Sequence, residues 1–332
     1  MVNETGKKPL TGLSTRAYIL SQLRKNPGVP AAGEKLAKGA GVSRVAVWKA
    51  ARSLAEAGYP VVSGKGGYRL RSTESDYLYP WEFGDKEDHF LYYPATDSTM
   101  DRARECALAG VSGGTIICAG TQTAGRGRNG KKWTSRKGGL FFTILERPKL
   151  SIINYTLLSM AAHIAAGRAL GKICGKEAFL RWPNDVYIDG KKAGGLLSEL
   201  YGEGDSVQWM AIGAGINVNN PVPGGASGCA AVLGRAVSRR DVLLAILDEF
   251  GKIKRAASDP IKIRDLWNYH AEGTGSRAIF TGACTFRNES RSGGNILARG
   301  IFLGVDYSGR CMLETEREIV GFSPAQGSLI FY

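Results

Sequence analysis

The sequence predicts an α+β protein in three parts: an N-terminal helical domain that ends in a β-hairpin, a central α/β domain, and a small C-terminal β-barrel. Three observations predict this order. The length of 332 residues exceeds one ordinary domain, helical and β-rich stretches follow one another in three blocks, and positive charge is concentrated in the first block. We expect domains at residues 14–72, 90–272 and 276–332, with the acidic, aromatic segment 73–90 as a link.

The composition indicates a folded, water-soluble chain, because 43% of its residues are hydrophobic and 22% are charged. No apolar run approaches the roughly 20 residues of a membrane helix, and the polar segment Met1–Leu10 lacks the apolar core of an export signal. We therefore expect a cytoplasmic protein with no membrane partner. The six cysteines and three histidines are scattered, so we expect reduced thiols, no metal site formed by the protein alone, and a structural role for His163.

The first domain has a pattern of three short helices followed by two β-segments. Helical spacing predicts the first helix at Thr15–Lys25, which Asn26-Pro27-Gly28 ends. The other predicted elements are a helix at 33–38, a turn at 39–42, a helix at 44–57 with Ser43 as its N-cap, and a glycine-turned hairpin of 61–63 and 68–70. This order is typical of a winged helix-turn-helix, with the helix-turn-helix at 33–52.

Positive charge favours DNA binding by this domain. Residues 1–72 carry seven Lys and six Arg against three Glu, a net charge of +10, whereas the other 260 residues contribute only +4 of the total of +14. Such asymmetry is typical of a nucleic-acid-binding segment, although a solvated basic face would carry the same charge. The candidate DNA contacts are Ser43, Arg44, Lys49 and Arg52. The residues of the same helix that we expect to pack inward are Val45, Val47 (or Trp48) and Leu54.

A glycine-rich loop follows the first long strand predicted in the central domain. Strand-like stretches at Thr115–Ala119 and Leu140–Leu145 enclose the loop Thr121–Trp133, whose glycines let the backbone approach a ligand closely. Nine residues of it hold four cations: Arg126, Arg128, Lys131 and Lys132. A phosphate-binding P-loop is excluded, because a lysine stands where that motif needs Ser or Thr and no helix follows. The loop predicts a site for an anionic ligand, or alternatively a surface contact with nucleic acid.

Two further motifs follow in the central domain. Arg181-Trp182-Pro183-Asn184-Asp185 ends one predicted strand, and Lys192 comes seven residues after Asp185. A strand at Met210–Ile212 then runs into the glycine-rich stretch Gly213–Asn219. Together with Asp97-Ser98-Thr99 and the loop, in this order and spacing, these motifs resemble biotin protein ligases of the bifunctional ligase/repressor type. The resemblance extends from about residue 14 to the C-terminus.

The resemblance implies a fold and a set of ligand contacts. It implies a central mixed sheet of the kind shared with lipoate ligases and class II tRNA synthetases, and an SH3-like β-barrel at the C-terminus. Biotin would contact Ser98, Thr99, Met100, Gln122, Arg126, Gly127, Arg128 and Lys192. Two positions depart from the family pattern: Met100 stands where many relatives have Asn, and Arg181 where Lys usually precedes Trp-Pro-Asn-Asp. Arginine keeps the charge of lysine but not its geometry.

The implied chemistry needs a cluster of cations. A carboxylate acylates an amine only after it acquires a leaving group, which ATP supplies as AMP, and carboxylate and triphosphate repel each other. We expect Lys192, Arg126 and Arg128 to be catalytic, with Lys192 between the biotin carboxylate and the α-phosphate. The residues expected to position ATP or Mg²⁺ are Asn184, Asp185 and Asn217. Alternatively, Lys192 is an exposed turn lysine and Asp185 a structural turn residue.

The resemblance also implies partners. It implies that biotin is transferred to a lysine of a biotin carboxyl carrier protein, and that a homodimer binds an operator of biotin genes and represses them. Three alternatives stay open: a ligase whose N-terminal domain has no regulatory role, a lipoate- or octanoate-type ligase on the same fold, and a biotin-sensing regulator without ligase activity. The loop favours biotin over lipoate, and the presence of Lys192 and the loop arginines favours an enzyme.

Overall fold

The computed structural model describes residues 12–73, 76–149, 151, 155–282 and 296–332. The chain divides into two compact units, Met1–Tyr92 and Tyr93–Tyr332. Met1–Leu10 and Cys284, which entered the expectations about an export signal and about thiols, lie outside the described residues. The described cysteines are free thiols: Cys106, Cys118, Cys174, Cys229 and Cys311. None of the described helices combines the length and the apolar character that a membrane crossing requires.

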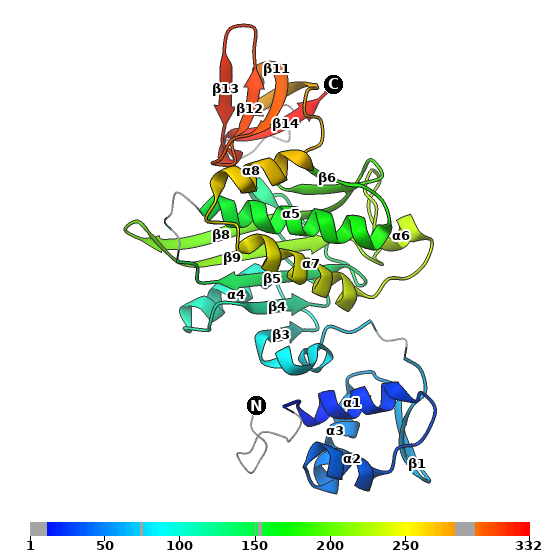
Figure 1. The fold of residues 1–332 in the computed structure, drawn as a ribbon. Coiled ribbons are helices and arrows are strands. Elements are labelled where there is room, and N and C mark those ends of the chain that lie inside the picture. The colour runs from blue at the N-terminus through cyan, green and yellow to red at the C-terminus, as the bar shows by residue number, and fades with distance from the viewer. Residues whose placement is uncertain (1–11, 74–75, 150, 152–154, 283–295) are drawn as a thin grey trace. The chain divides into compact units, whose positions relative to one another are not determined.

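The first unit, as described up to Leu70, consists of three α-helices and a hairpin. Its elements are α1 (Thr15–Lys25), α2 (Gly33–Ala40), α3 (Arg44–Glu56), β1 (Val61–Gly64) and β2 (Gly67–Leu70) (Figure 1). Ser14 and Ser43 cap α1 and α3, since each hydroxyl accepts a hydrogen bond from a backbone amide three residues on. β1 and β2 pair antiparallel. The predicted helix-turn-helix with its wing is confirmed.

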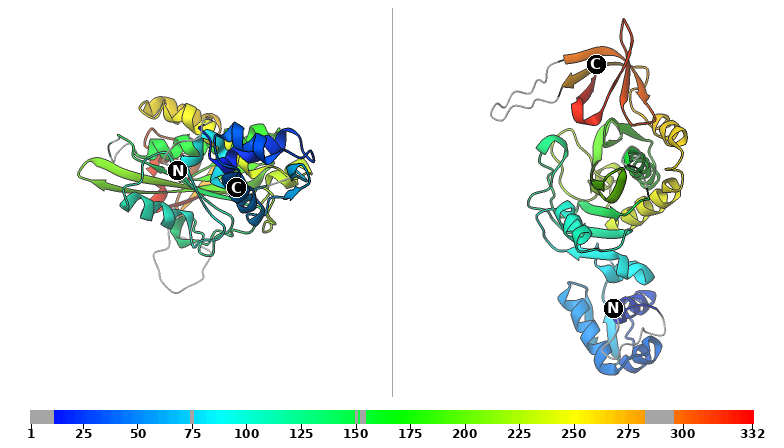
Figure 2. Two further views of the ribbon diagram at one scale, coloured as in Figure 1. Left: turned by 90° about the horizontal axis from the view of Figure 1, so that it is seen from below. Right: turned by 90° about the vertical axis from the view of Figure 1, so that its left-hand side faces the viewer.

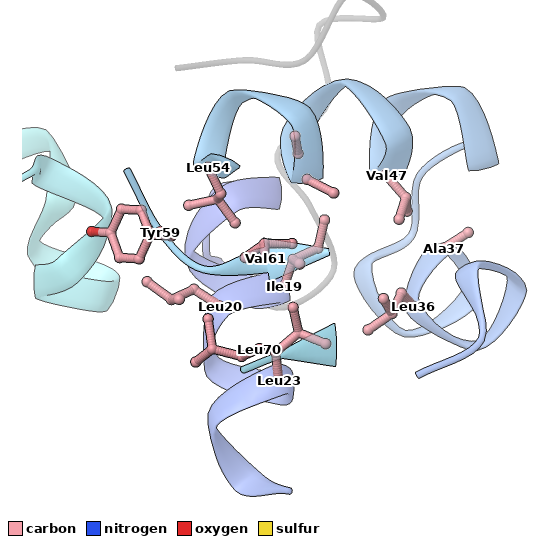
Figure 3. Packing of buried hydrophobic residues seen from close by; sticks show 12 residues of the cluster. Ile19, Leu20, Leu23, Leu36, Ala37, Val47, Leu54, Tyr59, Val61 and Leu70 are labelled. Atoms are coloured by element: carbon pink, nitrogen blue, oxygen red, sulfur yellow. The ribbon is translucent and has the colours of Figure 1, made fainter. Parts of the chain in front are cut away.

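The core of this unit lies between the helices and the hairpin. The residues buried together include Ile19, Leu20, Leu23, Leu36, Val47, Leu54 and Leu70 (Figure 3). Val47 and Leu54 pack inward as predicted. Val45 is 60% exposed and Trp48 is 50% exposed, so the predicted inward packing of Val45 is wrong, and Val47 rather than Trp48 enters the core. The helical period explains this, because residues 47, 50, 51 and 54 share one face of α3, and residues 45 and 48 lie on the other.

The acidic, aromatic segment after the hairpin belongs to the first unit and packs against the rest of it. It contains the 3-10 helix η1 (Pro80–His89), in which Glu82 is buried. The Glu82 carboxylate accepts hydrogen bonds from both Nη atoms of Arg24, at 2.7 and 2.8 Å, and from the Tyr59 hydroxyl at 2.5 Å. Trp81 stacks on Tyr79 with ring centroids 4.6 Å apart. The segment expected as a link therefore contributes buried contacts of its own.

The second unit is built around a sheet. Its strands are β3 (Phe90–Tyr93), which spans the boundary between the units, β4 (Thr115–Ala119), β5 (Leu140–Glu146), β6 (Ala178–Arg181), β7 (Asp185–Ile188), β8 (Lys191–Glu203) and β9 (Ser206–Ile216). Beyond β3 their order is β4-β5-β9-β8-β7-β6, paired antiparallel. Isolated parallel bridges, such as Thr96–Gln122, lie outside the strands. β4 and β5 are buried along their whole length, which explains their mostly apolar sequences.

Helices cover both faces of this sheet. α4 (Thr99–Leu108) lies on one face, and α5 (Tyr155–Cys174) and α7 (Arg239–Lys254) lie on the other (Figures 1 and 2). The other elements before the C-terminal sheet are η2 (Arg128–Gly130), α6 (Cys229–Leu233) and α8 (Pro260–Tyr269). α5 is apolar on most of its surface because both the sheet and α7 pack against it. The predicted central mixed sheet with helices is confirmed.

The C-terminal part is an antiparallel sheet. Its elements are β10 (Arg277–Gly282), β11 (Ile296–Val305), β12 (Cys311–Glu314), β13 (Ile319–Phe322), η4 (Pro324–Gln326) and β14 (Gly327–Phe331). The strand order is β13-β12-β11-β10-β14, which leaves β13 and β14 at opposite ends in the part that the structure describes. The predicted β-rich C-terminal region is confirmed, but these pairings form an open sheet and not a closed barrel.

Candidate functional site

Strands β7, β8 and β9 place two glycines and a carboxylate side by side. The register aligns Asp185 of β7 with Gly195 of β8, and Gly195 with Gly215 of β9. Paired residues of neighbouring strands point to the same face of a sheet. This is the face that α4 covers, because Gly213, two residues before Gly215, lies against Met100 of α4. The glycines form a floor on which other side chains can rest.

Glycines at two positions of this floor leave room for neighbouring side chains. A methyl group on Gly213 would lie 2.6 Å from the sulfur of Met100, and one on Gly215 would overlap the indole nitrogen of Trp133. The predicted glycine-rich stretch Gly213–Asn219 is not a separate loop at its start, because β9 continues through it as far as Ile216. Its glycines admit Met100 from α4 and Trp133 from the end of the glycine-rich loop.

A cavity of about 370 Å³ lies over this floor. Predicted biotin and nucleotide residues from four separate stretches of the sequence line it: Ser98, Thr99, Met100, Gln122, Arg126, Gly127, Arg128, Asn184, Asp185 and Lys192. Among the described residues, Asn217 is the one member of the predicted set outside the lining. Its Oδ1 accepts a hydrogen bond from Asn220 at 3.1 Å, and its backbone is bonded to Ala193 and Cys229.

Hydrogen bonds hold the polar side of the cavity in place. Ser98 caps α4 by accepting a bond from the amide of Met100 at 3.2 Å. The Gln122 Oε1 accepts bonds from the amide and the hydroxyl of Thr99, at 2.8 and 3.2 Å, and its Nε2 donates to Ser135 at 2.8 Å. Because these partners restrain the side chains in advance, little ordering is left for a ligand to impose.

Lys192 is held inside the cavity by an ion pair. It is the second residue of β8, opposite Tyr187 at a bulge in the β7–β8 pairing. Its Nζ donates to Asp185 Oδ2 at 2.7 Å and lies 5.4 Å from the centroid of the Trp133 ring. The alternative of an exposed turn lysine does not describe this half-buried, ion-paired side chain.

His163 of α5 supports Asp185 through its backbone. The ring is buried, its Nε2 lies 3.0 Å from the carbonyl oxygen of Asp185, and Trp267 Nε1 donates to its Nδ1 at 3.1 Å. Since Nδ1 accepts a hydrogen bond, Nε2 carries the proton and donates to Asp185. Burial lowers the pKa of His163 to about 4, so the ring is neutral near pH 7. These contacts agree with the structural role expected for His163.

The two arginines of the loop have different partners. Arg126 donates to both carboxylate oxygens of Asp101 on α4, at 2.7 and 2.8 Å, and this bond raises the pKa of Arg126. Arg128 donates to the backbone carbonyls of Pro324 and Gly327, beside β14. Burial lowers the pKa of Arg128, and the negative charge of Asp185 opposes this effect. Arg128 thereby joins the loop to the C-terminal sheet.

Positive charge dominates the cavity. Its described lining contains one carboxylate, Asp185, and six cationic side chains: Arg126, Arg128, Lys131, Lys132, Arg181 and Lys192. Arg181 forms two 2.6 Å hydrogen bonds to Glu272, and its guanidinium lies 3.7 Å from the centroid of the Tyr187 ring. Such a lining suits a ligand that carries several negative charges.

Sequence reasoning missed several residues that support the site. Asp101, Glu272 and Trp267 lie 25, 91 and 104 residues from the side chains that they bind, so no local spacing indicates them. Two signals in the sequence could have indicated Trp133. It is the one aromatic residue of the loop, and Gly213 and Gly215 stand two residues apart in a strand, where they leave room for a ring on one face.

The outer face of α3 carries the predicted DNA contacts. Arg44, Lys49 and Arg52 are exposed. Arg52 is paired with Glu56 at 2.8 Å. The Ser43 hydroxyl accepts a hydrogen bond from an amide of the helix at 3.2 Å, so this side chain already serves as a cap.

Known proteins are similar to both units. Two family models match, the biotin/lipoate A/B protein ligase family over residues 92–217 and an HTH domain over residues 15–69. The bifunctional ligase/repressor BirA of Bacillus subtilis (strain 168) is 32% identical over 305 residues, which cover 86% of this chain and 90% of that protein. The biotin–[acetyl-CoA-carboxylase] ligase of Paracoccus denitrificans is 34% identical over 231 residues, 66% of this chain and 91% of that protein.

A solved structure shares the architecture. The biotin protein ligase from Aquifex aeolicus in complex with biotin and ATP has a TM-score of 0.60 at 27% identity, and the match covers 73% of this chain and 99% of that chain. The cavity, the helix-turn-helix and a match over 86% of the sequence agree with one another. This chain belongs to the family of bifunctional biotin protein ligase/repressors.

Proposed function

We propose that this chain activates biotin with ATP and transfers the biotinyl group to a lysine of a biotin carboxyl carrier protein. The observation that carries the proposal is the cavity, in which six cationic side chains and one carboxylate share about 370 Å³ with restrained polar groups. The relatives support the choice of substrates, since one was solved in complex with biotin and ATP and another is named for acetyl-CoA carboxylase.

The first step joins two anions. A biotin carboxylate oxygen attacks the α-phosphorus of ATP, the bond from that phosphorus to the bridging oxygen breaks, and pyrophosphate leaves. Cations placed between the reactants offset their repulsion and the charge of the transition state. Lys192, held by Asp185 at 2.7 Å, bridges the carboxylate and the α-phosphate. Arg126 and Arg128 neutralise the remaining phosphate charge. Arg126 does so by sharing with the phosphate, or giving up, the hydrogen bonds that it donates to Asp101.

The polar side of the cavity binds the ring system of biotin. Ser98, Thr99 and Gln122 offer donors and acceptors that already have fixed orientations. Gly127 lets the loop backbone approach the ligand, and Met100 supplies an apolar wall. Biotin pairs a polar ureido group with an apolar chain, and this division of the lining matches it.

The second step transfers the acyl group. The amine nitrogen of the carrier lysine attacks the carbonyl carbon of biotinyl-AMP, the carbon–oxygen bond to AMP breaks, and AMP leaves with the electron pair. The new amide nitrogen loses its proton to solvent. The mixed anhydride is reactive enough that no covalent enzyme intermediate is required.

We also propose that Mg²⁺ accompanies ATP. In the described part of the chain no group of three or more His, Cys, Asp or Glu side chains could hold a metal ion, but Mg²⁺ needs only one or two carboxylates when substrate phosphates supply the other ligands. Asp185, with Asn184 beside it, fits that requirement. When bound, the ion would neutralise phosphate charge and improve pyrophosphate as a leaving group. Asn217 would assist indirectly, through the backbone that it holds at the end of β9.

The first unit supports a regulatory role. We propose that a homodimer of this chain binds an operator of biotin genes, because a two-fold dimer presents two helix-turn-helix units to two half-sites. Domain limits at 14–72, 90–272 and 276–332 are part of this proposal.

Mass spectrometry of a carboxyl carrier protein tests the ligase proposal. Incubation with this chain, ATP, Mg²⁺ and biotin is expected to add one biotinyl group to one lysine. Parallel incubations replace biotin by lipoate or octanoate. Modification by lipoate alone would replace the proposal with a lipoate-type ligase, and no modification by any acid would contradict ligase activity.

A further inference from the structure

The outer face of α3 carries apolar side chains among its cations. Val45 and Trp48, in the first two turns of the helix, are 60% and 50% exposed. They lie three residues apart, a spacing that brings helical side chains together into one strip. Arg44, Lys49 and Arg52 are exposed on the same face. The core of the first unit leaves this strip in solvent.

Charge and position identify what covers the strip. The net charge of +10 over residues 1–72 suits a polyanion. In a helix-turn-helix the second helix enters the major groove, and its N-terminal residues meet the base edges. α3 is that second helix, and Val45 and Trp48 belong to its N-terminal half. The major groove of double-stranded DNA therefore fits both the cations and the apolar strip.

We propose that Val45 and Trp48 read thymines in the DNA through their C5-methyl groups. This inference rests on the proposed DNA binding and adds the way in which sequence is recognised. Thymine presents a methyl group in the major groove, and apolar side chains distinguish it by burying that group. Cations of the same helix that bind phosphates do so whatever the sequence, so phosphate contacts supply affinity and register but carry no sequence information themselves.

Contacts on α3 restrain the indole in advance. The guanidinium of Arg52 lies 5.6 Å from the centroid of the Trp48 ring, and its Nε lies 2.8 Å from Glu56. A cation over one face of the indole limits its motion. A restrained side chain loses less entropy on binding, and this favours a discriminating contact.

Matched DNA fragments with and without thymine methyl groups test the inference. The intact chain, with biotin and ATP present, selects a duplex from a random library, and that duplex is then copied with thymidine or with deoxyuridine nucleotides. Deoxyuridine pairs like thymidine but lacks the methyl group. We expect the intact chain to bind the deoxyuridine duplex about fourfold more weakly for each methyl group that it buries.

Variants of α3 connect the effect to the two residues. Val45→Ala and Trp48→Ala should bind the thymidine duplex more weakly, and the double variant should no longer distinguish the two duplexes. Val29→Ala is the matched control, because Val29 is 59% exposed in the same unit but lies outside the helices. It should behave like the intact chain. Circular dichroism checks that each variant is folded.

The salt dependence separates base reading from phosphate binding. Val45→Ala and Trp48→Ala should leave the slope of log affinity against log salt unchanged, whereas Arg44→Ala should reduce it. Recognition of the methyl groups would be contradicted if the intact chain bound both duplexes equally well. It would also be contradicted if the double variant lost the same factor of affinity for both duplexes. In either case the proposed DNA binding itself would still stand. If the intact chain selects no duplex and shows no salt-dependent binding, the proposed DNA binding fails, and this inference fails with it.

Discussion

At Lys192 the pairing of β7 and β8 selects one of two adjacent lysines. The bulge opposite Tyr187 brings Lys192 beside Asp185, whereas Lys191, one residue earlier, is exposed. Successive residues of a strand point to opposite faces, so the charge of Lys191 cannot enter the cavity as that of Lys192 does. The chain thus contains its own control for the role of Lys192.

Replacing Lys192 tests this assignment. Lys192→Ala should reduce pyrophosphate release with biotin and ATP by at least about a hundredfold, because a cation between two anions is lost. Lys191→Ala should release pyrophosphate at nearly the normal rate. Both variants should stay folded, since a partly exposed ion pair contributes about 1 kcal/mol or less to stability. Near-normal release by folded Lys192→Ala would contradict the role.

His163 predicts a pH dependence of stability. Its pKa falls from 6.5 in the unfolded chain to about 4 in the folded one, so the unfolded chain takes up a proton first as the pH drops. The stability associated with the neutral ring is complete above pH 6.5, is lost progressively as the pH falls from about 6.5 to about 4, and has then decreased by about 3 kcal/mol.

The comparison with a non-titrating residue isolates this effect. Glutamine at position 163 can accept from Trp267 and donate to Asp185 without taking up a proton. Urea unfolding of the intact chain and of His163→Gln, at about pH 7 and about pH 4.5, should show a smaller loss of unfolding free energy in the variant. Equal losses would mean that other groups cause the pH dependence.

Among the elements, η1 departs most from its expected role. A segment rich in acids and aromatics was expected to link domains, yet Glu82, Trp81 and Tyr79 pack against the first unit. The cause is a buried carboxylate with strong partners: Arg24 of α1 binds it with two hydrogen bonds, and the Tyr59 hydroxyl adds a third. Burial raises the pKa of Tyr59, and the Glu82 charge raises it further.

Arg24 should therefore be important for stability. Arg24→Met leaves the Glu82 carboxylate buried without its cation and should destabilise the first unit by about 3–5 kcal/mol. Arg24→Met combined with Glu82→Gln should recover part of this loss, because the buried charge is gone. Arg52→Ala, which breaks an exposed pair with Glu56, should cost about 0.5 kcal/mol or less. Thermal unfolding measures all three, and similar effects of Arg24→Met and Arg52→Ala would contradict the argument.

The glycine-rich loop offers a test at the same scale. Two of its cations already have partners within the protein: Asp101 binds Arg126, and the backbone carbonyl of Gly327 binds Arg128. Asp101→Asn should therefore increase tryptic cleavage at Arg126 in the absence of ligand. Biotin with ATP should protect the loop in both proteins. Equal cleavage of the two proteins without ligand would show that the ion pair does not restrain the loop.

The whole molecule combines a DNA-binding unit with a catalytic unit whose cavity includes its C-terminal sheet. Ser328 and Leu329 line the cavity, and Arg128 binds backbone carbonyls of the same region. The first unit has its own core and its own capped helices. Among the described residues, those of the second unit alone line the cavity, and the first unit has a separate core. We therefore expect the N-terminal domain to be dispensable for adenylation.

Deletion of residues 1–72 should abolish DNA binding and leave biotin-dependent pyrophosphate release largely intact. Because η1 then loses Arg24 and Tyr59, the truncated chain should be less stable than a full-length variant with Arg44, Lys49 and Arg52 changed to Glu. That charge-reversed variant should also lose DNA binding while it keeps adenylation. Gel shifts and pyrophosphate assays measure both activities. Loss of adenylation in the charge-reversed variant would show that the two functions are coupled.

Local signals were sufficient for several of the elements and for the motifs. Ser14 and Ser43 start helices, glycines turn the wing, and apolar runs give β4 and β5, because caps, turns and hydrophobic periods act within a few residues. The motif order also identified many of the residues that meet in the cavity, although Asn217 lies outside its lining. Resemblance supplied that set, since spacing in the sequence does not bring 98–100 near 192.

Only the folded chain decided which partner each charge has and which face each residue takes. Arg126, Arg181 and Arg128 bind groups 25, 91 and 199 residues away. Such contacts depend on how strands pair and how the C-terminal sheet meets the loop, and no local period encodes them. On α3, hydrophobicity alone assigned Val45 to the buried face, whereas the structure places it on the exposed face. An apolar residue can belong to a core or to a ligand-binding surface, so its hydrophobicity does not decide between them.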